Sequence, residues 1–284
     1  MDRKQPSSLD YESLLHELAL KNWRRSLLEA DFPRALQNAD QLARSRDRFW
    51  RWQGTLDLAV TRLCQGRSEN AREALEAAKA CFREVPGLRV PALEIEAHFW
   101  LETGRPRRAL EAALEAEVET PVLSYVRGLA HARLAQRDAA ESIARDLART
   151  GAPLGRALSR HVAAEARPEA AVMLLMEGAS SLALAECEPA SAGILVRFAL
   201  ASALLEKNEV ESALGVFDEV LRDGEAVLYW PITFIRALFF RGRIHALGGN
   251  ESGASADGAR FLSWWAMGDL DRERIDEARH WVKS

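Results

Sequence analysis

The sequence repeats itself, and this feature limits the fold more than any other property of the chain. One unit recurs: an amphipathic helical stretch, a short polar break, and a second helical stretch that begins near a small residue, usually Ala. The clearest copies are LDLAVTRLCQGRSENAREALEAAKA, IEAHFWLETGRPRRALEAALEAE, ALASALLEKNEVESALGVFDEVL and RALFFRGRIHALGGNESGASADGARFL. Such a unit buries its apolar face only by stacking on its neighbours. The pattern therefore predicts a stack of helical hairpins.

Composition favours the same all-α fold. Ala, Leu, Arg and Glu are the dominant residues, and all four are good helix formers. The β-branched residues that favour strands are thinly spread. A chain of 284 residues is long enough for an elongated array, because a solenoid is not limited to one globular core.

The repeated segments resemble the tetratricopeptide repeat, a helical hairpin of about 34 residues in which small residues let the two helices pack closely. In that register the first small residues of the second helices are Ala35, Ala71, Ala109, Ala140, Ala171, Ala213 and Ala254. The small residues of the first helices are Ala59, Ala97, Gly128, Ser159, Ala201 and Gly242. The resemblance covers approximately residues 12–283. It implies an all-α solenoid of about seven hairpins in a right-handed superhelix.

The spacing of these hairpins is irregular. Successive small residues of the second helices are 36, 38, 31, 31, 42 and 41 residues apart. The widest spacing coincides with residues 177–193, for which a hinge and an extended helix pair are equally good interpretations. The predicted organisation is a flexible N-terminus over 1–11, hairpins over 12–178, a hinge over 179–193, and hairpins with a capping helix over 194–284.

The C-terminal segment GNESGASADGARFLSWWAMGDLDRERIDEAR has a more specific resemblance. It is similar to the closing segment of tetratricopeptide regions that accompany bacterial signalling kinases and transcriptional regulators. The resemblance implies that Phe261, Leu262, Trp264 and Trp265 dock a closing helix over residues 271–282. Aromatic side chains at helical spacing belong more often to a core than to a ligand site, so we interpret this cluster as a C-terminal cap.

Motifs of common enzyme chemistry are missing from the sequence. It has no GxxxxGK(S/T), GxGxxG, HExxH, CxxC or GxSxG, and its six histidines lack metal-ligand spacing. Cys64, Cys81 and Cys187 are far apart in apolar helical pattern, which is typical of reduced thiols in the cytosol. We therefore expect a protein that is not an enzyme, with no catalytic residue, no metal site and no cofactor.

Charge and hydropathy narrow the class of partner. The net charge of −4 provides no general attraction to nucleic acid. The basic and aromatic stretch RSRDRFWRW could stack on single-stranded nucleic acid, but partial burial of Phe49, Trp50 and Trp52 explains it better. The first residues lack the apolar core of a signal peptide, and no apolar run reaches about 18 residues. We expect a cytoplasmic protein without a membrane or nucleic-acid partner.

The resemblance also implies a binding face, because the first helices of tetratricopeptide hairpins line the concave surface of the array. Positions three before and one after the small residue of each first helix then face the groove. These are Glu94, His98, Tyr125, Arg156, Arg160, Phe198, Ser202, Phe239 and Arg243, with Arg236 one turn earlier. Guanidinium groups among aromatic rings suit an acidic or amphipathic peptide.

The leading hypothesis is a scaffold or adaptor in a bacterial regulatory system that binds a protein or peptide in this groove. A second hypothesis is a sensory module that binds a signalling peptide and transmits the event by changing the curvature of the superhelix. A third, RNA binding by helical repeats, would repeat the same base-reading side chains in each unit, and the sequence does not. The sequence leaves a homo-oligomer open.

Overall fold

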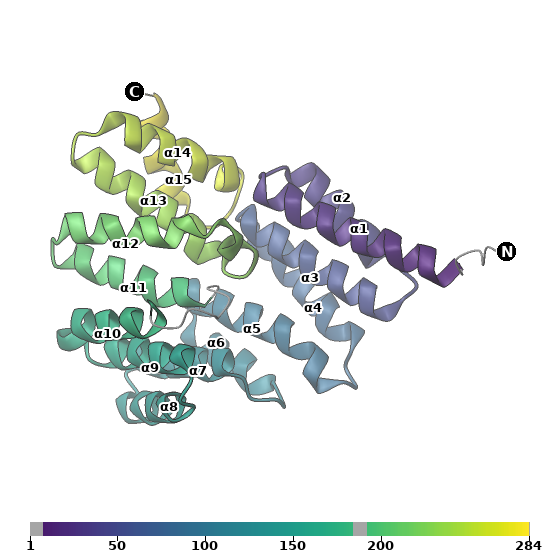
Figure 1. Ribbon diagram of the computed structural model, residues 1–284, viewed down its shortest axis with the longest axis horizontal. Helices are drawn as coiled ribbons and strands as arrows, with labels where there is room; N and C mark the ends of the chain where they lie inside the picture. The colour runs from purple at the N-terminus through teal and green to yellow at the C-terminus, as the bar shows by residue number, and fades with distance from the viewer. Residues whose placement is uncertain (1–7, 184–191, 284) are drawn as a thin grey trace, which may run out of the picture.

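The computed structural model describes residues 8–183 and 192–283 and is helical throughout its regular elements. In these residues fifteen α-helices form seven consecutive hairpins and one closing helix, which confirms the predicted all-α solenoid (Figure 1). The hairpins are α1 (Ser8–Leu28) with α2 (Phe32–Ala43), α3 (Arg48–Cys64) with α4 (Ser68–Cys81), α5 (Pro86–Glu102) with α6 (Pro106–Glu115), α7 (Pro121–Arg133) with α8 (Arg137–Arg149), α9 (Pro153–Ala166) with α10 (Ala171–Ala183), α11 (Gly193–Glu206) with α12 (Val210–Arg222), and α13 (Pro231–Leu247) with α14 (Glu251–Trp265); the closing helix is α15 (Arg272–Lys283). The handedness of the superhelix stays a prediction.

The helix boundaries follow from local chemistry. Pro86, Pro121, Pro153 and Pro231 begin four of the first helices. Proline is favoured there because its fixed φ suits the first turn and its missing amide hydrogen would have no helical partner. The breaks between these hairpins therefore fall at prolines.

One turn geometry closes the first helix in six of the seven hairpins. A residue with positive φ follows the helix in each case: Ala30, Gly66, Gly104, Ala135, Asn208 and Gly249. At the second hairpin Gly66 N donates to Leu63 O at 2.9 Å, and Arg67 N donates to Arg62 O at 2.9 Å, the pair of bonds of a Schellman motif. The fifth hairpin differs, because a 3₁₀ turn, η1 (Pro168–Ala170), joins α9 to α10.

Small residues set the distance between packed helices, as the sequence predicted. The second-helix residues Ala35, Ala71, Ala109, Ala140 and Ala213 are almost fully buried. Gly128 shows why the first-helix position must be small: a Cβ there would lie 2.8 Å from Val162 Cγ1 and 3.2 Å from Ile143 Cγ2. Close approach of this kind buries apolar surface without leaving a void.

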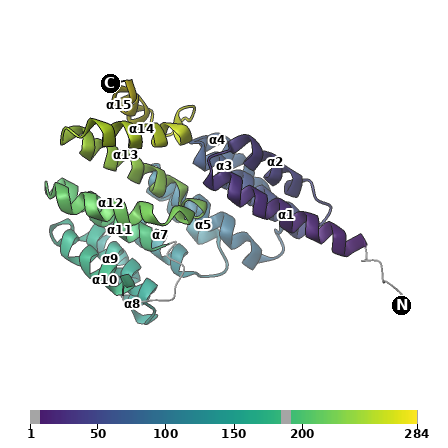
Figure 2. The same cartoon turned by 45° about the horizontal axis from the view of Figure 1, so that its top comes forward.

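The array curves until its first two hairpins touch the last one, a feature that the sequence did not predict. In Figures 1 and 2 the first two hairpins lie beside the C-terminal one. Gly66 O accepts from Asp269 N at 2.9 Å and from Leu270 N at 3.2 Å, while Ser68 N donates to Asp269 Oδ1 at 2.9 Å. Trp265 Nε1 donates to Leu63 O at 3.2 Å. We call these contacts the closure.

The closure revises the predicted role of the C-terminal aromatic residues. Phe261 packs against Phe239 of α13, as a cap residue would. Trp264 instead meets Phe32 of α2 edge to face at 5.6 Å, and Trp265 reaches α3. The closing helix itself docks through Trp281, which stacks on Phe239 at 5.2 Å. Trp264 and Trp265 therefore join the two ends of the array.

Two further predictions meet the limits of the described residues. Helix α1 begins at Ser8, earlier than the predicted start at residue 12, and residues 1–7 lie outside the described part. Residues 179–183 continue α10, but 184–191, which include Cys187, are not among the described residues. The hinge over 179–193 stays a prediction. Cys64 is a free, buried thiol, and Cys81 is free and partly buried.

Candidate functional site: the inner cavity

The first helices of five hairpins surround a cavity of about 460 Å³, which we call the inner cavity. Helices α5, α7, α9, α11 and α13 contribute side chains to its wall, together with α10 and the first turn of α15. A cavity of this size lies within the range of small-ligand pockets, about 300–1,000 Å³. It could hold the end of a peptide or a few of its side chains.

Four of the predicted site residues line this cavity. Tyr125 comes from α7, Phe198 and Ser202 come from α11, and Arg236 comes from α13. The Phe198 and Ser202 side chains lie one helical turn apart, so both face the same space. Phe240 of α13 stands 5.9 Å from Phe198, ring centre to ring centre, and adds a second aromatic surface.

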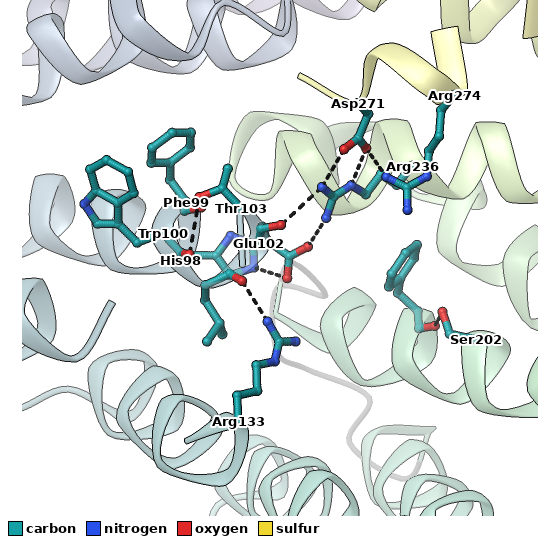
Figure 3. A network of polar contacts seen from close by, with 12 residues as sticks. His98, Phe99, Trp100, Glu102, Thr103, Arg133, Ser202, Arg236, Asp271 and Arg274 are labelled. Atoms are coloured by element: carbon teal, nitrogen blue, oxygen red, sulfur yellow. Dashed lines mark hydrogen bonds and ion pairs between the residues drawn. The ribbon is translucent and has the colours of Figure 1, made fainter. Parts of the chain in front are cut away.

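Arg236 is already held by two carboxylates. Its Nη1 donates to Glu102 Oε2 at 2.6 Å, and its Nε and Nη2 donate to the two oxygens of Asp271 at 2.7 and 3.0 Å. Arg274 Nη1 also pairs with Asp271 Oδ2 at 2.5 Å. Figure 3 shows Arg236 between Glu102 and Asp271, bridging α5, α13 and the start of α15. A bidentate pair of this kind fixes the guanidinium in one orientation.

Burial and neighbouring charges together set the pKa values of this network. Burial opposes ionisation of Glu102, but its interaction with His98 and the positive charges of Arg236 and Arg133 lower the pKa of its carboxyl below the usual value. Burial likewise opposes ionisation of Asp271, and Arg236 and Arg274 lower its pKa. Burial lowers the pKa of His98 to about 4. His98 is therefore neutral at pH 7, and the arginines stabilise the carboxylates.

A second set of polar contacts connects α7 and α9 in the cavity wall. The Tyr125 hydroxyl lies 2.8 Å from His161 Nδ1. Arg133 Nε donates to Glu165 Oε1 at 2.9 Å, and Arg133 Nη1 donates to Leu101 O at 2.7 Å. Burial lowers the pKa of His161 to about 4, so this imidazole is neutral at pH 7 and can accept a hydrogen bond from the Tyr125 hydroxyl.

Six predicted site residues lie away from the inner cavity, and four of them belong to α5 and α13. His98 is buried 4.8 Å from the Trp230 ring, and Glu94 accepts from Thr120 Oγ1 at 2.6 Å. Phe239 is 1% exposed and belongs to the core. Arg243 pairs with Glu277 at 3.3 Å at a separate recess between α13 and α15. In α13 the predicted Arg236 faces the cavity together with Phe240, whereas the predicted Phe239 and Arg243 do not.

Arg156 and Arg160 lie on another face of α9. The Ser159 hydroxyl donates to Ala144 O of α8 at 2.6 Å, so this side of α9 packs against α8. The residues of α9 that line the inner cavity are His161, Ala164 and Glu165. His161 and Glu165 lie three before and one after Ala164, which indicates that Ala164, rather than Ser159, is the small residue equivalent to Gly128. The 3₁₀ turn after α9 explains the shift, because the usual spacing to the second helix is lost there.

Sequence reasoning missed several residues of the wall, although a signal for some of them was present. Glu102, Arg133 and Glu206 all line the cavity and all lie five residues after the small residue of their helix. A charged side chain at that repeated position could have identified them. Arg274 carries no such signal, since α15 has no equivalent in the other hairpins.

In the described residues no three His, Cys, Asp or Glu side chains gather closely enough to hold a metal ion. Among the same residues no helix combines the length and apolarity that crossing a membrane requires.

Comparisons with known proteins add little to this geometry. No protein-family model matches the chain, and the curated proteins yielded no match. One similar solved structure is a tetratricopeptide repeat protein from Parabacteroides merdae ATCC 43184, with 16% identity, a TM-score of 0.47, and coverage of 95% of this chain and 100% of that chain. By its own helices, this chain is an all-α solenoid of helical hairpins.

Proposed function

We propose that this chain is a non-catalytic adaptor of a bacterial regulatory system, and that it binds a protein or peptide in the inner cavity. The observation that carries the proposal is the convergence of Tyr125, Phe198, Ser202 and Arg236, from three different helices, on one uncovered space. The array thus presents a composite surface that no single hairpin could form. Stacked hairpins generally provide extended binding surfaces of this type.

The lining suits a peptide better than a rigid polar metabolite. Phe198 and Phe240 offer apolar surface, while Arg236 and Arg274 share the single carboxylate of Asp271. An acidic group on the partner can compete with Asp271 for Arg274, whose side chain is 33% exposed. An amphipathic or acidic segment therefore matches both kinds of wall.

A capture experiment tests the adaptor function. The Ser202→Arg variant places a long side chain in the inner cavity. Ser263→Arg is the matched control, because Ser263 is exposed on α14. Like the hydroxyl of Ser202, the hydroxyl of Ser263 donates to a carbonyl of its own helix. Proteins recovered from the source cells are compared by quantitative mass spectrometry. The expected result is loss of a specific partner with Ser202→Arg and retention with Ser263→Arg.

Two outcomes would contradict this proposal. Equal recovery by both variants would exclude the inner cavity as the binding surface. No partner recovered by the unmodified protein above a bead control would count against the adaptor function itself.

A peptide-sensing regulatory module is the second candidate, and the position of Arg236 favours it. Arg236 lines the cavity and also connects α13 to α5 and α15 through Glu102 and Asp271. A ligand that draws Arg236 away would loosen contacts between distant hairpins. A change in the radius of gyration on binding, measured by small-angle scattering, would support sensing, and an unchanged radius would support a passive adaptor.

A further inference from the structure

A second recess of about 1,090 Å³ lies on a different face of the molecule, and we call it the outer groove. Helices α8 and α10 form its two sides, and α9 forms its floor. In Figures 1 and 2 these three helices are neighbours at the end of the molecule away from α1 and α2. The α9 residues of this groove differ from those of the inner cavity, so the two spaces are separate.

The floor of the outer groove and its α8 side are made largely of small side chains. Ala144 and Ala148 contribute from α8, and Ser159 and Ala163 contribute from α9. Each pair is spaced by four residues and therefore forms a stripe along its helix. Small residues allow another helix backbone to approach closely, as they do inside the hairpins of this protein.

One side of the groove exposes apolar surface. Met173 and Met176 of α10 are 58% and 54% exposed, although the adjacent Leu174 and Leu175 are buried. Two methionines one turn apart present a continuous flexible apolar edge. Methionine is favoured at surfaces that bind helical partners, because its side chain adapts to their shape.

The rim of the groove is positive, against the net charge of −4 for the whole chain. Its cations are Arg145, Arg156, Arg160, Arg167 and Lys207, and its carboxylates are Glu141, Glu169 and Glu177. Glu177 pairs with Arg160 at 3.0 Å, and Glu141 pairs with Arg167 at 3.2 Å. Within the described part of the chain, no carboxylate forms an ion pair with Arg145, Arg156 or Lys207.

From this arrangement we infer that the outer groove binds an acidic amphipathic helix of a protein partner. The apolar face of that helix would lie on the small floor and on Met173 and Met176, and its carboxylates would meet Arg145, Arg156 and Lys207. Single-stranded nucleic acid fits less well, because none of the described residues that line the groove has an aromatic side chain to stack on bases. The inference adds a second surface to the proposed function and does not depend on the inner cavity.

Methionine NMR provides a direct test, because the chain has only four methionines. Met173 and Met176 report on the groove, while Met267, 81% exposed between α14 and α15, serves as an internal reference. The probe is a synthetic amphipathic peptide of about 18 residues, long enough to become helical, with Leu on one face and Glu on the other. We expect the ¹³C-methyl signals of Met173 and Met176 to shift on titration, and that of Met267 to stay in place.

Charge reversal identifies the recognition chemistry. In the double variant Arg145→Glu and Arg156→Glu the peptide should bind about tenfold more weakly or worse, since like charges would face each other. Arg149→Glu makes the same change on α8 outside the groove and should bind as the unmodified protein does. Circular dichroism melting of each variant separates a loss of binding from a loss of fold.

Several results would overturn the inference. They are an absence of shifts at Met173 and Met176, equal binding of a peptide with Lys in place of Glu, and stronger shifts with a single-stranded RNA oligonucleotide. Shifts that appear on raising the protein concentration alone would assign the groove to a second copy of the chain. The Ser202→Arg variant should keep the peptide-induced shifts, so failure of the inner cavity and failure of the outer groove are distinguishable.

Discussion

At the scale of single residues, the molecule keeps several ionisable groups neutral inside its core. Asp57 of α3 is 2% exposed, its Oδ1 accepts from Gln53 at 2.8 Å, and its Oδ2 has no hydrogen-bond partner among the described residues. Burial raises the pKa of Asp57 to about 8, which the hydrogen bond from Gln53 only partly opposes. A buried carboxyl group with one partner is more stable in its protonated form.

Asp57 should therefore make stability fall as the pH rises. The unfolded chain loses this proton near pH 3.8, whereas the folded protein keeps it to about pH 8. Between these values the folded state binds more protons, so raising the pH favours unfolding. The Asp57→Asn variant should be more stable than the unmodified protein at pH 8 by up to a few kcal/mol, since one pKa unit corresponds to about 1.4 kcal/mol.

Chemical denaturation at a series of pH values checks this expectation. The difference in unfolding free energy between Asp57→Asn and the unmodified protein should grow from pH 4 to pH 8. The exposed Asp146→Asn substitution on α8 is the matched control. Parallel curves for all three proteins would show that Asp57 is ionised in the folded state.

At the scale of the helical hairpin, the position of the turn varies less from unit to unit than the spacing of the units does. Each of the six positive-φ residues lies five positions before the small residue of the following helix, as Gly66 does before Ala71. Glycine occupies three of these six turns, while Ala30, Ala135 and Asn208 occupy the others. A left-handed conformation costs an L-residue about 1–2 kcal/mol, so the alanine turns carry strain.

Relief of that strain gives a prediction for the fourth hairpin. Ala135→Gly should stabilise the protein by roughly 0.5–1 kcal/mol, because the removed strain exceeds the added flexibility of the unfolded chain. Ala148→Gly, inside right-handed α8, should destabilise it by about 1 kcal/mol. Urea unfolding midpoints measure both changes. A lower midpoint for Ala135→Gly would mean that the turn is relaxed with alanine.

The hairpins were predictable from sequence because their contacts are local. Small residues, prolines and amphipathic stretches each act within one unit, and they predicted all seven hairpins. The cavity wall was predicted well on α7 and α11, where Tyr125, Phe198 and Ser202 face inward. The prediction of the wall failed on α9. There a 3₁₀ turn replaces the usual turn, and the equivalent position is Ala164 instead of Ser159.

At the scale of the whole molecule, the closure joins residues that are 201 positions apart, such as Ser68 and Asp269. No local pattern encodes such a contact, since it depends on the summed curvature of all the intervening hairpins. The same curvature buries His98 against Trp230 and brings Arg236 to Glu102. The inner cavity is thus a property of the complete array.

Two glycines allow the contribution of the closure to be measured. Gly66 and Gly104 both have positive φ, but a Cβ on Gly66 would lie 3.2 Å from the Trp265 ring, whereas one on Gly104 would meet nothing within 4 Å. Gly66→Ala and Gly104→Ala should share the conformational penalty of about 1–2 kcal/mol. Gly66→Ala should lose a further ~1 kcal/mol and increase the radius of gyration, because crowding at Trp265 opens the closure.

Denaturant titration of both variants measures the loss of stability, and small-angle scattering measures the radius of gyration. Equal losses of stability together with equal radii would mean that the ends separate freely in solution.

The closure also bears on how such a chain can evolve. Open solenoids lengthen readily, because a duplicated hairpin contacts only its neighbours and leaves the rest of the array unchanged. Here one extra hairpin, or one fewer, would carry Trp265 and Asp269 away from Leu63 and Ser68 and remove the bonds between the ends. The number of hairpins is therefore fixed by geometry, as the number of strands is fixed in a barrel. We expect variation in such a chain through substitutions and loop lengths, and not through gain or loss of whole units.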